Sequence, residues 1–279
     1  GFKGADVIFG NAGNDFADAG SGTDFVFGNE GDDQLRGAAG RDVIFGDNGE
    51  VEVFANGDTT RVTDDGAPAS YDASTFDPKI LTTLTPGTGG SDEIFGGIDD
   101  DVIFGGASTD DVDGEGGRDL IFGDHGFAEF SYDKAIGASL MTAASTSDPA
   151  QGAADTLLGG LGSDIILGGT GGDTIDGDLP DDGTIPQSDD VILGDFGELT
   201  RLQTVKLKTA LVAEITTVAG GLGIGSDIPA PADYGNDIVT GGGGADVIFG
   251  GLGNDRLQGG RSGTGEGETR DILVGDDGR

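Results

Sequence analysis

The sequence lacks several features that would point to common protein classes. It contains no cysteine, which excludes disulfide bonds and thiolate metal sites. No run of about 18 apolar residues occurs, so no segment is predicted to span a membrane. Basic residues are scarce, with 14 Lys and Arg against 52 Asp and Glu. Because affinity for nucleic-acid phosphate comes from Lys and Arg, a nucleic-acid partner is excluded.

Catalytic motifs are missing as well. There is no Gly-Lys-Ser/Thr phosphate loop, and no nucleophile can be grouped with a base and an orienting residue. Asp176-Gly177-Asp178 begins like an EF-hand loop, but Gln187 stands where that loop needs Glu. The single histidine, His125, is predicted to be a solvated turn residue. These absences predict a protein that is not an enzyme.

Processing signals are also absent. No cleavable signal peptide is found at Gly1, and no Asn-x-Ser/Thr sequon occurs. Because the chain opens and closes inside a repeating pattern, we expect it to be a segment of a larger protein.

Glycine, by contrast, is abundant, with 58 of 279 residues against only 8 prolines. The glycines do not recur at every third residue, so collagen is excluded. Residues 241–258 read GGGGADVIF and then GGLGNDRLQ, two units of the form Gly-Gly-x-Gly-x-Asp-x-U-x in which U is a large aliphatic residue. Six residues so rich in glycine favour a tight turn, and the last three are long enough only for a short strand. The unit therefore predicts a turn followed by a strand.

The same unit can be placed seventeen times by its aspartate, which occupies the sixth position. The repeat runs cover 1–49, 87–126, 150–197 and 234–278, and the segments 50–86, 127–149, 177–189, 198–233 and 259–270 interrupt them. Each run closes with Gly-Asp-x-Gly, whose aspartates are Asp47, Asp124, Asp195 and Asp276. The sixth-position aspartates are Asp6, Asp15, Asp24, Asp33, Asp42, Asp92, Asp101, Asp110, Asp119, Asp155, Asp164, Asp173, Asp190, Asp237, Asp246, Asp255 and Asp271.

This pattern resembles the RTX (repeats-in-toxin), hemolysin-type family of calcium-binding nonapeptide repeats. The resemblance implies an all-β fold, a right-handed parallel β-roll, with calcium along both turn edges. It carries the role of metal ligand over to the seventeen sixth-position aspartates. It also implies a bacterial protein that leaves the cell unfolded by type I secretion and folds outside, so we expect an extracellular or cell-surface location.

Calcium chemistry agrees with the repeat. Ca²⁺ takes about six to eight oxygen ligands, and one turn with its carbonyls and one carboxylate supplies too few. Two turns stacked eighteen residues apart supply enough, which predicts partners such as Asp6 with Asp24 and Asp24 with Asp42. The turns divide into edges of nine and eight, with at most fifteen intervals between stacked turns, and fifteen Ca²⁺ would change the net charge from −38 to −8. Without metal the facing carboxylates repel, so the metal-free chain should be largely unfolded.

Some units depart from the pattern at the fourth position. The glycine there is replaced by Asp99, Ser108, Ala153, Ser188 and Thr269. We expect about a quarter of the turns to be held by hydrogen bonds alone, with Asp155, Asp190 and Asp271 the weakest metal sites, because these three also follow interruptions. The closing-turn aspartates occupy the second position of the unit, so they are predicted to cap a metal site or only to fix the turn.

The residues on either side of the eighth position, which point away from the roll interior, predict where the interrupting segments pack. The eighth-position residues, from Ile8 to Leu273, are expected inside the roll. When strands are assigned alternately to two sheets, all eighteen outward residues of the first sheet are apolar, among them Phe27, Phe104 and Phe249, whereas the second sheet is mostly polar. A sheet that is apolar on both sides is normally covered on both. We therefore expect one continuous roll with the long interruptions packed on the first sheet.

The interruptions bring apolar residues of their own: Val51, Val53, Phe54, Phe127, Phe130, Tyr132, Leu199, Leu202, Val205 and Leu207. Glu50–Phe54 and Thr60–Val62 are predicted to form a hairpin, and 127–132 reads as extended. Residues 210–218 fit a short helix and a strand equally well.

The sequence leads to two functional hypotheses. The first is a calcium-dependent structural module of a larger secreted or cell-surface protein. The alternative is an adhesin, surface-layer or filament segment that self-associates or binds a surface through the apolar face, which then has to be exposed.

Overall fold

The computed structural model describes residues 2–55, 58–63, 78–84, 88–133, 138–148, 150–178, 188–201, 212–217, 235–260 and 270–275. Within these residues every regular element is a β-strand. They therefore contain no helix long and apolar enough to cross a membrane. The strands form two nine-stranded parallel sheets, here sheets A and B, and a seven-stranded antiparallel sheet, here sheet C. The predicted all-β fold with parallel sheets is confirmed, whereas the right-handed sense of the coil stays a prediction.

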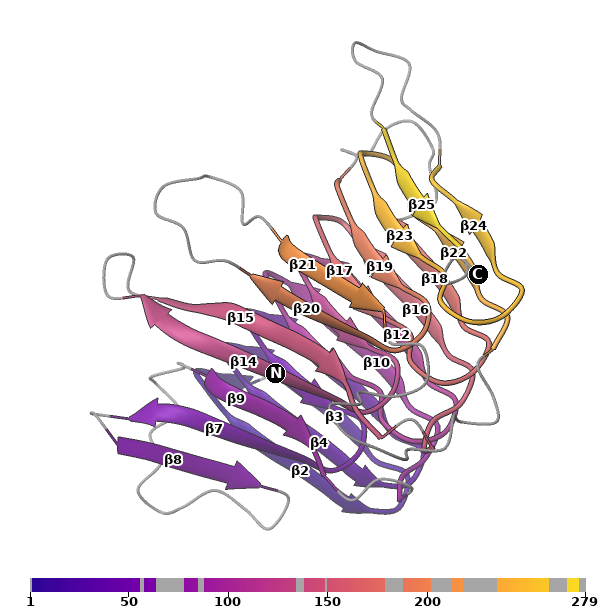
Figure 1. The fold of residues 1–279 in the computed structure, drawn as a ribbon. Helices are drawn as coiled ribbons and strands as arrows, with labels where there is room; N and C mark the ends of the chain where they lie inside the picture. Colours follow the sequence, from indigo (N-terminus) through magenta and orange to yellow (C-terminus); the bar gives the residue numbers. More distant parts are fainter. Residues whose placement is uncertain are drawn as a thin grey trace, which may run out of the picture.

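Sheets A and B take their strands alternately from the repeat runs, and the coils stack one on another along the molecule (Figure 1). Sheet A contains β1 (Phe2–Lys3), β3 (Phe16–Ser21), β5 (Gln34–Ala39), β10 (Glu93–Ile98), β12 (Asp111–Gly116), β16 (Thr156–Gly160), β18 (Thr174–Asp178), β22 (Ile238–Thr240) and β24 (Arg256–Gln258). Sheet B contains β2 (Val7–Ala12), β4 (Phe25–Glu30), β6 (Val43–Phe45), β11 (Val102–Phe104), β13 (Leu120–Phe122), β17 (Ile165–Leu167), β19 (Val191–Leu193), β23 (Val247–Phe249) and β25 (Ile272–Val274).

The interior between sheets A and B, which together form the roll, is built from the eighth residue of each unit. In register, Ile8 lies beside Val26 and Val26 beside Ile44, so the same position packs on itself from coil to coil. These aliphatic side chains form one buried cluster contributed by both sheets. The predicted interior is confirmed except at Leu273, which is 46% exposed. Leu273 lies in β25, the last strand of sheet B, and no coil within the described residues stacks beyond it.

Sheet C is formed by the interrupting segments. Its order is β21 (Val212–Thr217), β20 (Gly197–Arg201), β15 (Ala138–Thr146), β14 (Gly126–Asp133), β9 (Pro78–Thr83), β7 (Gly49–Ala55) and β8 (Asp58–Thr63). The predicted hairpin is confirmed by β7 and β8, which pair from Glu50–Thr63 to Ala55–Asp58. The segment left open between helix and strand contains strand β21, in agreement with its β-branched residues.

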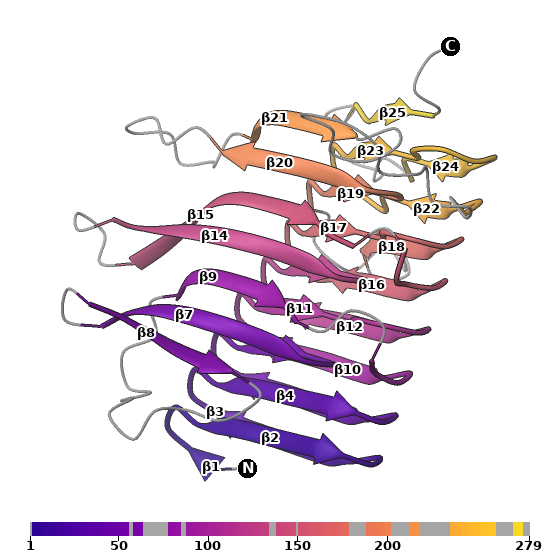
Figure 2. The ribbon, with the colours of Figure 1, turned by 60° about the horizontal axis from the view of Figure 1, so that its bottom comes forward.

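Sheet C covers the apolar outer face of sheet B. Figure 2 shows the strands of sheet C running along one side of the stacked coils. Fifteen of the eighteen outward residues of sheet B belong to, or pack against, one buried cluster, which also takes in Val51, Leu81, Ala128, Phe130 and Leu199 from sheet C. The predicted cover is therefore confirmed. Leu202, Val205 and Leu207 lie outside the described residues, as do the side chains of Phe54 and Tyr132.

A row of stacked phenylalanines marks the centre of this interface. Phe9, Phe27, Phe45, Phe104 and Phe122 follow one another with ring centroids 4.5–5.2 Å apart and planes within 11° of parallel. Phe27 and Phe104 are fully buried, so the roll does not present this face to solvent there. The row exists because one position of the unit repeats at the coil spacing.

Replacing Phe104 with Ala should destabilise the folded protein by about 3–5 kcal/mol, because it removes a buried ring and leaves a cavity between the neighbouring rings. Phe16→Ala is the matched control, since Phe16 is 65% exposed on the outer face of sheet A. Denaturant unfolding at saturating calcium measures both. Equal effects of the two substitutions would contradict the assignment of the covered face.

Candidate metal centre

Each sixth-position aspartate ends a turn directly before a strand, so stacking of the coils brings these side chains into two rows. Along each row the backbone N–H of one aspartate donates to Oδ1 of the aspartate in the next coil. The first edge consists of Asp6, Asp24, Asp42, Asp101, Asp119, Asp164, Asp190, Asp246 and Asp271, with N–Oδ1 distances of 2.6–3.3 Å. The second consists of Asp15, Asp33, Asp92, Asp110, Asp155, Asp173, Asp237 and Asp255, at 2.7–3.1 Å. The expected division into nine and eight is confirmed.

The other carboxylate oxygen, Oδ2, has no hydrogen-bond donor. In sixteen of the seventeen aspartates this atom is buried and unpartnered in the part of the chain that the structure describes. Asp271 is the exception, since its residue is exposed at the end of the stack. A buried carboxylate oxygen without a donor is costly, because it has lost water and gained nothing in exchange. The two rows therefore present a series of oxygens that require a positive partner.

Glycine at the first position of the unit makes room beside these oxygens. A Cβ on Gly28 would lie 2.2 Å from the carbonyl oxygen of Gly46 and 2.4 Å from Oδ2 of Asp33. The same two neighbours, a carbonyl one coil away and a carboxylate Oδ2, surround the first glycine of most other units. At these glycines a side chain would collide with both atoms, and its absence lets a carbonyl oxygen and a carboxylate oxygen converge.

Left-handed backbone at the fourth position explains why most units have glycine there. Gly13 has φ of 110° and Gly31 has 127°. Asp99 and Ser108, which replace glycine, keep the same geometry with φ of 86° and 73°. The units of Asp155 and Asp190 also keep their place in the rows, because Oδ1 of each accepts a backbone N–H, from Asp110 and Asp164 respectively, and Oδ2 is buried. The fourth-position departures thus leave these carboxylates aligned, while Thr269 lies outside the described residues.

Burial and crowding raise the pKa values of the row. The pKa rises from an ordinary 3.8 to about 7 for Asp92, about 9 for Asp101 and about 11 for Asp110. Burial is the main cause in each case. The neighbouring carboxylates add to it, and the backbone N–H that reaches Oδ1 opposes it. Without a cation, the folded chain favours the protonated form of these groups.

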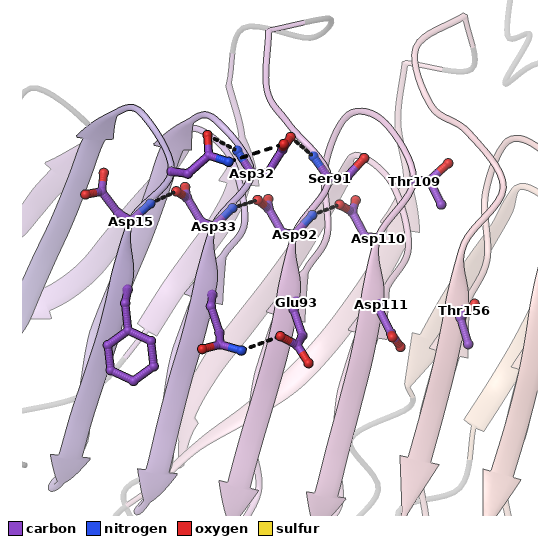
Figure 3. A pocket seen from close by; sticks show the side chains of 13 residues that line it. Asp15, Asp32, Asp33, Ser91, Asp92, Glu93, Thr109, Asp110, Asp111 and Thr156 are labelled. Atoms are coloured by element: carbon purple, nitrogen blue, oxygen red, sulfur yellow. Dashed lines mark hydrogen bonds between the residues drawn. The ribbon is translucent and has the colours of Figure 1, made fainter.

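The donor set suits calcium. Its atoms are carboxylate and carbonyl oxygens, which a hard cation prefers. Within the described residues no three acidic or histidine side chains converge on one point, so a site here has to use backbone oxygens together with the carboxylates. Figure 3 shows the arrangement along the second edge, where Asp15, Asp33, Asp92 and Asp110 follow one another at the head of their strands.

The closing-turn aspartates fix turns. Asp47 accepts the backbone N–H of Gly90 at 3.2 Å and that of Ala107, and Asp124 accepts from Ala153 at 3.1 Å and from Thr170. Asp195 accepts from Leu252. Asp276 lies outside the described residues. The turn role is thus present in all three described members, and metal ligation by them stays a prediction.

Sequence reasoning missed Asp178, which is the fourth such aspartate within the described residues. Its Oδ2 accepts the backbone N–H of Gly243 at 2.7 Å. The signal was present, because Asp178 follows Gly177 directly after a strand, as Asp47 follows Gly46. Asp178 nevertheless lacks the glycine two residues later that completes the Gly-Asp-x-Gly closing pattern.

His125 was predicted wrongly as a solvated turn residue, since it is fully buried. It is the third residue of a closing turn, and its counterparts Asn48 and Phe196 are buried too, at 8% and 7% exposed. The next residue starts a strand of sheet C, and the backbone oxygen of His125 accepts the N–H of Ser147 at 2.8 Å. The roll and sheet C therefore enclose this position, and burial lowers the pKa of the imidazole.

Comparison with known families agrees with this geometry. The family model of the RTX calcium-binding nonapeptide repeat (4 copies) matches residues 1–35, 18–50, 86–121, 150–182 and 232–262. These matches cover more than half of the chain and lie on the repeat runs, leaving out nearly all of sheet C. No match to the chain was found among curated proteins.

Asp246→Ala should weaken calcium binding at the two intervals that Asp246 borders, because each loses a carboxylate. The expected loss in affinity is at least about tenfold, since even indirect partners of a bound metal contribute that much. Asp18→Ala removes the same charge from an exposed position and serves as the control. Calcium titration by calorimetry and thermal melting check this; a variant that matches the parent in both would show that the ligand assignment is wrong.

Stability of the metal-free fold should fall as pH rises. The aspartates titrate near 4 when unfolded and at about 7 for Asp92 and 9 for Asp101 when folded, so in this interval the fold binds more protons than the unfolded chain. Its stability is greatest below about pH 4 and is lost through about pH 7–9. Circular dichroism in excess chelator at about pH 5 and pH 8 checks this. Equal β-signal at both would contradict the raised pKa values.

Proposed function

The chain belongs to the RTX calcium-binding nonapeptide-repeat family, and from that premise we propose that it is a structural module which folds when calcium occupies the intervals along its two turn edges. In this proposal the seventeen aspartates of the rows are ligands through Oδ2, with backbone carbonyl oxygens of the glycine turns completing each shell. The coils then follow the right-handed sense that crossovers between parallel strands adopt almost always.

One observation carries the proposal. Each aspartate in the interior of the described rows places one carboxylate oxygen on a backbone N–H and leaves the other buried, in most turns beside a carbonyl oxygen. A protein folding without metal would not repeat an uncompensated buried anion at the same position of each coil, because each one costs stability. A divalent cation in each interval compensates two neighbouring carboxylates at once.

The charge of the whole chain supports calcium at many intervals. The two rows contain eight and seven neighbouring pairs. One Ca²⁺ in each would reduce the net charge of −38 to −8. Self-repulsion of the compact state would fall accordingly. In the metal-free chain the same repulsion opposes folding, so calcium binding supplies free energy of folding.

A secreted or cell-surface role follows from this dependence. Extracellular calcium modules bind with dissociation constants of about 10⁻⁴–10⁻³ M, far above the calcium level inside a cell. A chain with this requirement stays unfolded in the cytosol and folds outside, which suits export of an unfolded polypeptide through a type I channel. We propose that route and an extracellular location.

The alternative, an adhesin or filament segment that binds through the apolar face of sheet B, has less support. Phe27 and Phe104 on that face are fully buried under sheet C. Exposed large apolar residues of sheet B are confined to β25, where Ile272 is 55% and Val274 36% exposed. Self-association through the centre of the face would require sheet C to leave it.

Chelation should unfold the protein. In excess chelator at about pH 7.5 the β-signal in circular dichroism is expected to disappear, and calcium should restore it cooperatively. Magnesium should fail, because it demands a tighter octahedral shell and loses water reluctantly. Folding that is independent of calcium would refute the proposed function.

A further inference from the structure

Five turns of the roll are interrupted by a segment that leaves the turn and returns to it, and four of them begin with the dipeptide Gly-Asp. The aspartates are Asp47, Asp124, Asp178 and Asp195, each at the second position of its unit. No uninterrupted turn has aspartate there; the second residue is Gly, Asn, Ala, Glu or, in the first unit, Phe. Aspartate at this position therefore occurs only in turns that open, although the fifth interrupted turn has glycine there, at Gly260.

Backbone geometry separates the four aspartates from the second residues of the uninterrupted turns that follow the first unit. In these turns the second residue has positive φ, from 63° at Glu115 to 122° at Gly97. None of the four aspartates has positive φ. The chain thus leaves the turn at this residue. The next coil therefore lacks the backbone oxygens that a continuous turn would offer to its N–H groups.

The carboxylate takes the place of that backbone. Each of the four accepts the N–H of the third residue of the turn stacked on it: Ala107 for Asp47, Thr170 for Asp124, Gly243 for Asp178 and Leu252 for Asp195. In continuous turns this N–H is met by backbone of the adjacent coil, as when the N–H of Leu161, third in its turn, donates to the oxygen of Glu115 at 2.9 Å. The fourth N–H of a continuous turn is met in the same way, as when Gly13 donates to the oxygen of Glu30 at 2.7 Å.

Two of the aspartates also hold the returning chain. The N–H of Gly90 donates to Oδ1 of Asp47, and the N–H of Ala153 donates to Oδ1 of Asp124. Gly90 and Ala153 are the fourth residues of the units in which the chain resumes the roll after the two insertions. One carboxylate thereby joins the departing chain, the returning chain and the next coil. Both of its oxygens are used, unlike those of the metal rows.

Glycine in the next coil completes the arrangement. A Cβ on Gly106 would lie 2.4 Å from Oδ2 of Asp47, and Gly169, Gly242 and Gly251 stand in the same relation to the other three aspartates, at 2.3–2.5 Å from the nearest atom. In each of the four turns stacked on these aspartates, the second residue is therefore glycine. The turn interrupted at Gly259–Gly260 has no aspartate, and no coil within the described residues stacks on it.

We propose that Asp47, Asp124, Asp178 and Asp195 are metal-independent clamps, which substitute a carboxylate for the missing turn backbone and so allow a segment to be inserted without breaking the roll. The rows of metal ligands continue across these openings with ordinary geometry. The N–Oδ1 distance is 2.8 Å from Asp33 to Asp92 and 2.9 Å from Asp164 to Asp190. The clamp rests on hydrogen bonds of the folded chain and does not require the proposed calcium function.

Hydrogen exchange tests the clamp directly in protein folded at saturating calcium. In Asp47→Ala, the amides of Ala107 and Gly90 should lose protection, while the amide of Gly13 in a continuous turn keeps it and so reports that the roll is folded. The number of calcium ions bound should stay that of the parent. Asp18→Ala, an exposed loss of the same charge, should leave all three amides unchanged, and Asp178→Ala with the amide of Gly243 repeats the test should Asp47→Ala fail to fold.

A double-mutant cycle separates the clamp from general strain. Gly106→Ala should raise the calcium concentration for half-folding much more in the parent than in Asp47→Ala, because the new methyl group meets the carboxylate only when it is present. Equal effects in both backgrounds, or unchanged exchange at Ala107, would overturn the clamp. A smaller number of bound calcium ions in Asp47→Ala would overturn its independence of metal and make Asp47 a ligand.

Discussion

The fold depends on how two rows of buried carboxylates are neutralised. The nine-residue unit repeats twice per coil, so every aspartate faces another at the spacing of neighbouring parallel strands, about 4.8 Å. Hydrogen bonding to backbone satisfies only half of each carboxylate. At this spacing the remaining charges repel one another in a partly dehydrated environment, where electrostatic interactions are strong. If calcium occupies the rows as proposed, the arrangement that opposes folding without metal supplies its oxygen ligands, and stability and metal binding become one property.

The apolar contacts are divided between two layers with different origins. The layer inside the roll comes from one aliphatic position of the repeat and is continuous from end to end. The layer outside sheet B combines another pair of repeat positions with strands from segments that are not repeats. Sheet B is thus buried on both faces while sheet A is buried on one, which accounts for the apolar residues that flank each eighth position in sheet B and the polar ones in sheet A. The outer layer gives the protein a stabilising interface that the repeat alone does not have.

A continuous stack and long insertions make conflicting demands on a turn. The stack needs each turn to meet the backbone of the next, whereas an insertion removes that backbone. The structure meets both demands at the second position of the turn, where a short acidic side chain reaches the groups that the departed chain no longer meets. The first strands of three insertions start within two residues of such an aspartate, at Gly49, Gly126 and Gly197, so the same turns also set where sheet C begins.

The sequence by itself determined the turns, the strands, the interior of the roll, the two rows of aspartates and the apolar outer face of sheet B. It could do so because contacts in a stack join the same position of successive units, and a period of nine residues specifies them without knowledge of the rest of the chain. Only the tertiary structure decided the order of sheet C, in which Leu81 pairs with Ala128 and Ala144 with Leu199 from different insertions. It also decided the burial of His125 and the exposure of Leu273. These depend on contacts between segments that share no period, or on the absence of a further coil within the described residues, and no local pattern in the sequence encodes them.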